Sequence, residues 1–223
     1  MNKAFKYNRL SKDDAVLLLV DHQAGLISLV QDFSPNEFKN NVLALTACGK
    51  YFKLPTILTT SFESGPNGPL VPEIKEMHPT APYIARPGNI NAWDNEDFVK
   101  AIKKTGRKQL IIAGTITSVC MAFPAIAAVH EGYKVFAVVD ASGTYSKMAQ
   151  ELTLARIVQA GVVPMDTAAV ASELQQTWNR ADAMEWAGVY TKVFPAYQLL
   201  IESYSKAREI EQTHETLDSQ KAA

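Results

Sequence analysis

The chain alternates between short runs that read as strands and longer segments with helical spacing. Three of these runs are almost wholly apolar, and they occupy residues 15–20, 109–114 and 135–139. Continuous rather than alternating apolarity indicates burial on both faces, which is typical of parallel sheets. Residues 56–60 and 162–163 are predicted to be two further strands.

The segments between these runs carry helix signals. Ser34 can cap a helix that has Pro35 in its first turn, and apolar residues follow at helical spacing. Helices are also predicted at about residues 121–131 and 147–160, where Gly132 and Gly161 end them. Strands that alternate with helices predict an α/β fold with three layers, in which a doubly wound, mainly parallel sheet carries helices on both faces.

Length and composition favour one domain. The chain has 223 residues, of which 47% are hydrophobic and 20% charged, and this is ordinary globular usage. We find no internal repeat and no low-complexity linker. Residues 1–205 are therefore predicted to form a single domain, and the polar residues 206–223 are predicted to form a tail.

Charge and cysteine content narrow the function classes. There are 22 Lys and Arg residues against 23 Asp and Glu residues, so no net basic field is available to bind nucleic acid. No apolar run approaches the roughly 20 residues that span a bilayer, and no secretory signal follows Met1. Two cysteines cannot form a disulfide scaffold. We therefore expect no membrane partner and a reducing, cytoplasmic setting.

Cys120 is the strongest candidate for chemistry. Sites in doubly wound sheets form beyond the carboxyl ends of the strands, and Cys120 follows a strand at the predicted start of a helix. A helix N-terminus lowers the pKa of a thiol, and free amides there can hold an oxyanion. The alternative is that Cys120 is a small buried apolar residue, which is the usual fate of a free cysteine. That second interpretation dominates for Cys48, which lies inside the helix that Ser34 caps.

Two charged residues also lie at predicted strand ends. Asp21 directly follows the first apolar run, as a general base would, although a cap or turn residue fits equally well. Arg86 cannot act as an acid or base near neutral pH, but it could orient a carboxylate or stabilise a thiolate. A surface ion pair is the alternative for Arg86. Asp140 has a position like that of Asp21, but turn residues follow it.

Several functional motifs are absent from the sequence. There is no G-x-S-x-G elbow, no G-x-x-x-x-G-K-[ST] loop and no G-x-G-x-x-G fingerprint. The four histidines do not form an H-x-x-x-H or H-x-H pair. We therefore expect neither a metal site nor a cofactor.

Two segments together resemble the isochorismatase-like cysteine hydrolases. They are residues 18–23 (LLVDHQ) and residues 112–120 (IAGTITSVC), which contain D-x-Q and G-x-x-T-x-x-C in that order. Residues 55–63, 65–73 and 85–94 are very similar to the YcaC-like branch of this family. The resemblance extends from about Leu10 to beyond Asp140.

The resemblance implies a catalytic triad of Asp21 as base, Cys120 as nucleophile and a basic residue between them. That residue is usually a lysine in the family, and Arg86 occupies its position here. The resemblance also implies a cis peptide bond between Thr115 and Ile116, with the amides of Ile116 and Cys120 as oxyanion donors. We further expect substrate contacts from five residues, namely Gln23, Phe62, Asn91, Trp93 and Thr117.

The predicted activity is hydrolysis of a small amide or related C–N substrate through a thioester. One alternative is a cofactor-free ether hydrolase of the isochorismate type, which needs no cysteine nucleophile. Another is a redox-sensing or non-catalytic oligomeric protein, in which Cys120 is oxidised. The resemblance implies a homo-oligomer, specifically an octamer. The aromatic residues within 167–204 suit either a partner surface or the chain's own core.

Overall fold

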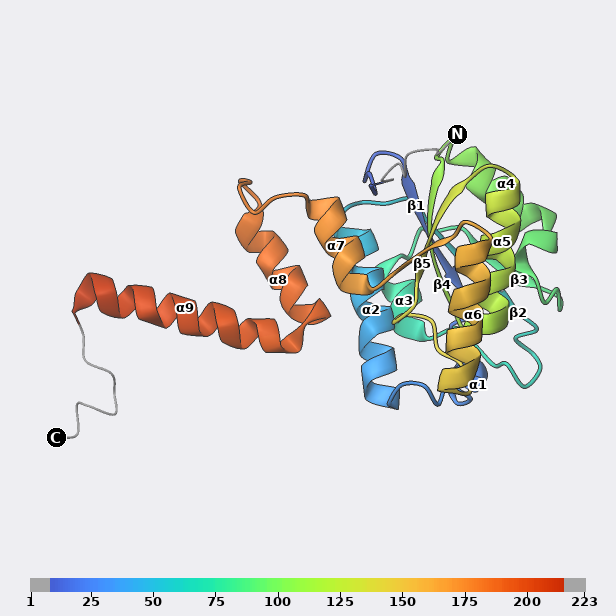
Figure 1. Ribbon diagram of the computed structural model, residues 1–223, viewed down its shortest axis with the longest axis horizontal. Helices are drawn as coiled ribbons and strands as arrows, with labels where there is room; N and C mark the ends of the chain where they lie inside the picture. The colour runs from blue at the N-terminus through green and yellow to red at the C-terminus, as the bar shows by residue number, and fades with distance from the viewer. Residues whose placement is uncertain (1–8, 215–223) are drawn as a thin grey trace.

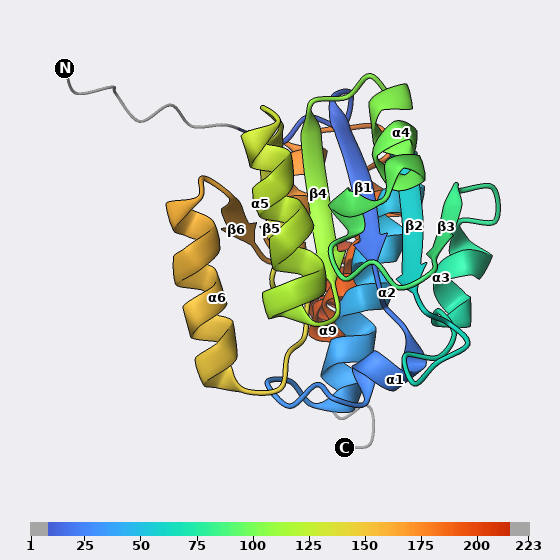
Figure 2. The same cartoon turned by 90° about the vertical axis from the view of Figure 1, so that its right-hand side faces the viewer.

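The computed structural model describes residues 9–214, and it contains a six-stranded sheet between two layers of helices (Figures 1 and 2). All strands are parallel, in the order β3-β2-β1-β4-β5-β6. The predicted α/β doubly wound fold is confirmed. The strands are β1 (Ala15–Val20), β2 (Thr56–Ser61), β3 (Tyr83–Arg86), β4 (Gln109–Gly114), β5 (Lys134–Val138) and β6 (Val163–Met165).

Within residues 9–214, helices connect the strands, and further helices follow the last strand. Ser34 caps the second helix as predicted, since its side chain accepts a hydrogen bond from the Glu37 N–H group. No helix within residues 9–214 is long and apolar enough to cross a membrane. The helices are α1 (Ala24–Ile27), α2 (Pro35–Tyr51), α3 (Pro72–Met77), α4 (Glu96–Lys104), α5 (Ala122–His130), α6 (Lys147–Gln159), α7 (Thr167–Gln175), α8 (Ala183–Val193) and α9 (Pro195–Thr213), with a 3-10 turn η1 (Ala92–Asp94) and a π-helical turn η2 (Thr117–Met121).

Each face of the sheet has its own apolar core. Leu17 and Leu19 of β1 pack into a cluster with residues of α2, α3 and α7. Val16, Leu18 and Val20 point the other way and pack with residues of α4, α5 and α6. Because successive side chains of a strand point to opposite faces, a strand covered on both sides must be apolar throughout. This explains the uninterrupted run at 15–20.

The order of the strands indicates at which edge of the sheet a ligand site is expected. The chain builds outward from β1 to β3, returns to the centre, and then builds outward from β4 to β6. The connections after β1 and β4, which are neighbours, therefore leave the sheet in different directions. In open α/β sheets, ligands bind at this switch point, outside the carboxyl ends of the strands.

The last two helices lie outside the sheet layers. Trp186 of α8 is fully buried and packs on Ala44 and Cys48 of α2, so it attaches α8 to the domain. Helix α9 then leads away from the body (Figure 1). It continues through residues 206–213, whereas residues 215–223 lie outside the described part. The division into a domain at 1–205 and a tail at 206–223 stays a prediction.

Candidate active site

Three strand ends deliver the three side chains of the predicted triad. Asp21 directly follows β1, Arg86 is the last residue of β3, and Cys120 lies in η2, which follows β4. The β2 strand lies between β1 and β3. The long Arg86 side chain spans that gap, and its Nη2 atom forms an ion pair with Asp21 Oδ1. Both side chains of the pair are completely buried.

All three nitrogens of the Arg86 guanidinium group donate hydrogen bonds. Besides the bond to Asp21, Nε donates to the Thr59 hydroxyl at 3.0 Å, and Nη1 donates to the Asn89 carbonyl. The Thr59 carbonyl also accepts the Asp21 N–H group at 2.9 Å. Thr59 therefore fixes both members of the ion pair. The sequence analysis missed Thr59 and Asn89, because their roles depend on which strands are neighbours.

Asp21 also faces Cys120. The thiol lies within hydrogen-bonding reach of the Asp21 carboxyl group, and Oδ2 of Asp21 has no nitrogen or oxygen partner among the described residues. Burial raises the pKa of the Cys120 thiol, and the neighbouring Asp21 raises it further, whereas Arg86 lowers it less. Burial also raises the pKa of Asp21, against the opposing effect of Arg86. The thiol is therefore protonated at rest, beside a carboxyl group that can accept its proton.

The structure corrects the expectation of a free helix N-terminus at Cys120. The Ile116 carbonyl accepts the N–H groups of Val119, Cys120 and Met121, at 3.1, 2.8 and 3.3 Å. Cys120 thus lies inside a π-helical turn, its amide is occupied, and the thiol pKa is raised rather than lowered. The peptide bond between Thr115 and Ile116 is cis. The Ile116 N–H group finds no acceptor among the described residues, so it remains a candidate oxyanion donor.

Gly114 allows this turn to lie close to the sheet. A Cβ atom at Gly114 would lie 3.0 Å from the Val20 carbonyl oxygen and 3.1–3.2 Å from backbone atoms of Met121 and Cys120. The Gly114 N–H group donates to the Ser142 hydroxyl at 3.1 Å. A larger residue would push η2, and Cys120 with it, away from β1.

The connection after β5 supports the site from the other side. The Thr117 N–H group donates to the Gly143 carbonyl at 2.9 Å. His22 is fully buried, and its Nε2 donates to the Ala141 carbonyl at 2.9 Å. Burial lowers the pKa of His22 to about 4, so the ring is neutral at physiological pH. These bonds join the ends of β1, β4 and β5.

Asp140 and Cys48, the other two candidates from the sequence, both contact elements of the fold away from the triad. Asp140 accepts hydrogen bonds from the N–H group and the hydroxyl of Thr167, both at 2.9 Å, at the start of α7. Cys48 is buried between α2 and α8, and burial raises the pKa of its thiol to about 12. Both residues therefore hold the fold together.

The structure gives Gln23 a scaffold role. Its side-chain amide donates to the carbonyls of Ser61 and Gly68, at 3.0 and 2.6 Å, and accepts the Ser61 N–H group at 2.8 Å. Both amide protons are used, and the residue is fully buried. Gln23 therefore positions the end of β2 and the loop beyond it, and it has no free donor for a substrate.

Trp93 and Asn91 are also engaged by the protein. The Trp93 indole N–H group donates to Glu131, beyond the end of α5, and the ring packs edge-on against Phe98 and Tyr133. The side-chain oxygen of Asn91, Oδ1, caps η1 by accepting the backbone N–H group of Trp93 at 3.1 Å. These contacts direct the Trp93 indole towards the C-terminal end of α5, and its expected substrate contact stays a prediction.

Phe62 and Thr117 remain candidates for substrate contact. Phe62 directly follows β2, its N–H group donates to the Arg86 carbonyl at 3.0 Å, and the residue is 49% exposed. Its φ of 49° lies in the left-handed region, which is uncommon for a bulky residue. Thr117 is buried, and its hydroxyl has no partner within residues 9–214.

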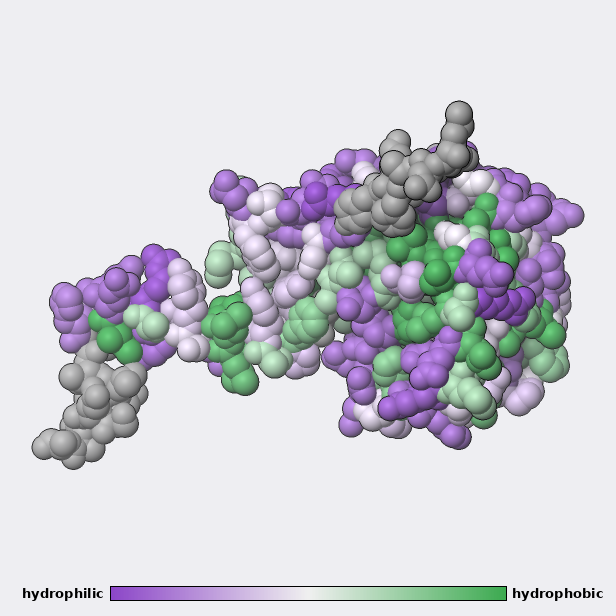
Figure 3. Space-filling view, viewed as in Figure 1, coloured by the Kyte–Doolittle hydropathy of each residue, from purple (hydrophilic) through white to green (hydrophobic). Residues whose placement is uncertain are grey.

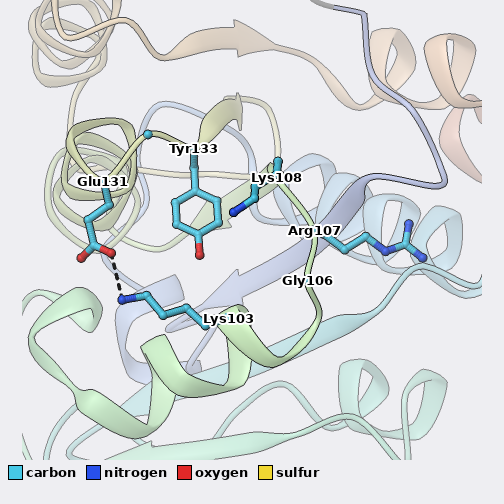
Figure 4. Close-up of a pocket in the computed structure, with 7 residues that line it drawn as sticks. Lys103, Gly106, Arg107, Lys108, Glu131 and Tyr133 are labelled. Carbon is cyan, nitrogen blue, oxygen red and sulfur yellow. Dashed lines mark ion pairs between the residues drawn. The ribbon is translucent and has the colours of Figure 1, made fainter.

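A separate pocket lies at the opposite edge of the sheet (Figure 4). It has a volume of about 280 Å³, and Lys103, which lines it, forms an ion pair with Glu131 at 3.1 Å. Lys108 precedes β4 and Tyr133 precedes β5, so the pocket lies at the amino ends of the strands. It is therefore separate from the triad. Within the described chain, no three His, Cys, Asp or Glu side chains are grouped to hold a metal ion.

The role of Thr59 can be tested by its removal. Thr59→Val keeps the shape of the side chain but removes the acceptor for Arg86 Nε and the donor to the Ile84 carbonyl, which lies at 2.7 Å. We expect the free energy of unfolding in urea to fall by about 1.5–3 kcal/mol, as for a buried hydrogen bond to a charged group. Thr59→Ser keeps the hydroxyl and should lose clearly less. Equal stability of the two variants would contradict this role.

The comparisons with known proteins agree with this geometry. An acid, a cation and a thiol meet at the carboxyl edge of a doubly wound sheet, and the family model "Isochorismatase domain" matches residues 15–169, which include all three. The chain therefore belongs to the isochorismatase family.

Its relatives include YcaC proteins, so the predicted resemblance to the YcaC-like branch is confirmed. "Probable hydrolase YcaC" of Escherichia coli K12 is 60% identical over 198 residues, which cover 89% of this chain and 95% of that protein. The crystal structure of Escherichia coli YcaC, described as an octameric hydrolase of unknown specificity, has a TM-score of 0.88 at 57% identity, and the match covers 92% of this chain and all of that one. YcaC from Pseudomonas aeruginosa, with hexane-2,5-diol and covalent acrylamide, also has a TM-score of 0.88, at 59% identity over 91% of this chain and all of that one.

Proposed function

We propose that this protein is a cysteine-dependent hydrolase of a small amide or related C–N substrate. The observation that carries the proposal is that one buried carboxyl group, on Asp21, faces both the guanidinium of Arg86 and the thiol of Cys120. A buried acid with a raised pKa beside a nucleophile is the arrangement that general-base catalysis requires. The probable-hydrolase description of the Escherichia coli relative supports the reaction class.

Acylation begins when Asp21 accepts the thiol proton of Cys120. The sulfur attacks the substrate carbonyl carbon, an S–C bond forms, and the carbonyl π electrons move onto oxygen. The Ile116 N–H group stabilises this oxyanion, and one such donor is typically worth about 3 kcal/mol. The C–N bond then breaks, Asp21 returns the proton to the leaving nitrogen, and a thioester remains on Cys120.

Deacylation uses the same carboxylate. Asp21 takes a proton from water, the oxygen attacks the thioester carbon, and the S–C bond breaks. The proton returns to the sulfur, the carboxylic acid leaves, and the enzyme is restored. Arg86 keeps its charge throughout and acts by orienting Asp21 and stabilising negative charge. A guanidinium therefore suffices at a position where the family usually has a lysine.

Two further observations favour this proposal over the alternatives. The Pseudomonas relative was solved with covalent acrylamide, so that protein reacts covalently with a small unsaturated amide. In this chain Cys120 is the nucleophile we expect to react in that way. Oxidation of a sensor cysteine follows thiolate character and exposure, and Cys120 is only 8% exposed with a raised pKa. This counts against redox sensing.

The decisive experiment combines a substrate screen with trapping of the intermediate. Small amides, hydroxamates and nitriles are incubated with the protein, and the released amine and the intact mass are followed together. We expect at least one substrate to add its acyl mass to the Cys120 peptide before water releases it. Turnover of a substrate with no adduct under rapid acid quench, and unchanged in a Cys120→Ala variant, would refute Cys120 as the nucleophile.

We also propose that the chain assembles as a homo-octamer. The crystal structure of the Escherichia coli relative is that of an octameric hydrolase, and its whole length aligns with this chain at a TM-score of 0.88. At 57% identity, surfaces as well as cores are commonly retained. Sedimentation of the full-length protein tests this directly, independently of any activity.

A further inference from the structure

A contact between two loops at the carboxyl edge of the sheet centres on Asp32. One loop, residues 28–34, connects α1 to α2, and the other, residues 139–146, connects β5 to α6. The two loops lie side by side (Figure 2). Asp32 accepts the Thr144 N–H group through Oδ1 at 2.8 Å and the side-chain amide of Gln150 through Oδ2 at 3.2 Å. Both oxygens of the carboxyl group therefore bind the second loop or the start of α6.

The backbone strengthens the same contact. The Thr144 carbonyl accepts the N–H groups of Gln31 and Asp32 at 2.8 and 3.3 Å, and Thr144 is completely buried. Gly143 packs closely on the first loop, because a Cβ atom on it would lie 2.6 Å from both γ-carbons of Val30. A shift of one loop would therefore move the other.

The second loop also binds the turn that contains Cys120. The Gly143 carbonyl accepts the Thr117 N–H group at 2.9 Å, and Thr117 is the first residue of η2. Ile116, whose N–H group is the candidate oxyanion donor, directly precedes Thr117. A continuous series of contacts therefore leads from Asp32 through the second loop to the thiol and to that donor.

Apolar burial holds the start of α6 in place only in part. The helix has 13 residues, and only three of them are buried. Met148 and Leu152, in its first two turns, are 69% and 66% exposed. The surface over α5 and α6 accordingly mixes apolar and polar side chains (Figure 3). A larger share in positioning the first turn of α6 is therefore left to the hydrogen bond between Gln150 and Asp32.

We propose that Asp32 is a positioning residue for the Cys120 thiol and the Ile116 N–H group. It acts through the 139–146 loop, whose Gly143 carbonyl fixes the start of η2. A carboxylate suits this role, because hydrogen bonds to an ionised acceptor are shorter and stronger than those between neutral groups. The expected effect on turnover rests on the proposed function, whereas the expected effect on thiol labelling needs no substrate.

The test substitutes Asp32 in the full-length protein and follows two readouts well below the melting temperature. Asp32→Ala should lower kcat for an amide found in the screen by about tenfold to a hundredfold with little change in KM, because the reacting groups are misplaced. It should also speed iodoacetamide labelling of Cys120 by about threefold or more, since a loosened η2 opens a thiol that is only 8% exposed. Asp32→Asn, which keeps an oxygen to accept the Thr144 N–H group, should stay close to wild type in both.

Asp14→Ala is the matched control. Asp14 also accepts a backbone N–H group from another segment, that of Lys108 at 2.9 Å, but it does so at the amino ends of β1 and β4. This variant should lose stability and keep both readouts of the wild type.

Equal changes in the two alanine variants, or wild-type readouts in Asp32→Ala, would overturn the inference. If no amide is turned over, the proposed function fails, and labelling alone decides the role of Asp32. If Asp32→Ala does not fold, Gln150→Ala removes only the second hydrogen bond. It should then show smaller changes in the same directions, and unchanged labelling would count against the positioning role.

Discussion

Cys120→Ala is expected to abolish turnover of any amide found in the screen, by at least about a thousandfold. In the proposed mechanism the sulfur forms the covalent intermediate, and no other described side chain near Asp21 and Arg86 is a comparable nucleophile. The variant removes one buried atom from the edge of an apolar cluster, so the fold should persist. Initial rates of amine release, beside a thermal melt, measure both effects.

Cys48 supplies the matched control for this experiment. It is also buried and also has a raised pKa, but it packs between α2 and α8. Cys48→Ala should therefore change stability modestly and leave turnover within a few-fold of wild type. Turnover retained by Cys120→Ala and lost by Cys48→Ala would overturn the assignment of the nucleophile. Acrylamide should label the wild type and Cys48→Ala at Cys120, and should not label Cys120→Ala there.

The parts of the site that the sequence predicts are those that depend on strand ends. Asp21 directly follows a run that is apolar on both faces, and such a run is a central parallel strand. The carboxyl ends of parallel strands share one edge, so a residue after β1 and one after β4 had to be near each other. The hydrophobic pattern therefore predicts that Asp21 and Cys120 lie at the same edge of the sheet, and the pairing of β1 with β4 brings them close together.

The parts that the sequence does not predict depend on hydrogen bonds between distant segments. Thr59 meets Arg86 and Asp21 because β2 lies between β1 and β3, and strand order is not written in any local pattern. The turn at Cys120 becomes a π-helix because one carbonyl, on Ile116, accepts three N–H groups. The aromatic side chain of Trp93 is of a kind that often lines pockets. Its hydrogen-bond partner, Glu131, lies 38 residues away in sequence, so the sequence gives no local sign of this contact.

Asp21→Asn is expected to separate the two effects of the carboxylate, since it should slow turnover and speed alkylation. Loss of the general base should lower turnover by about a hundredfold to ten-thousandfold. The charge of Asp21 raises the pKa of the Cys120 thiol, so its removal lowers that pKa, and the charge of Arg86 acts in the same direction. Thiolate is the form that is alkylated. The rate of iodoacetamide labelling should therefore rise at a lower pH in the variant than in the wild type.

The same substitution should destabilise the fold, because it leaves Arg86 buried without its counter-charge. Breaking a buried ion pair on one side typically costs about 3–5 kcal/mol, so the labelling is measured well below the melting temperature. Asp140→Asn is the matched control, since Asp140 also follows a parallel strand and also has a pKa raised by burial, but it binds Thr167. The labelling profile of Cys120 in this variant should coincide with that of the wild type. A profile for Asp21→Asn that stays in place, with turnover intact, would mean that Asp21 neither faces the thiol nor accepts its proton.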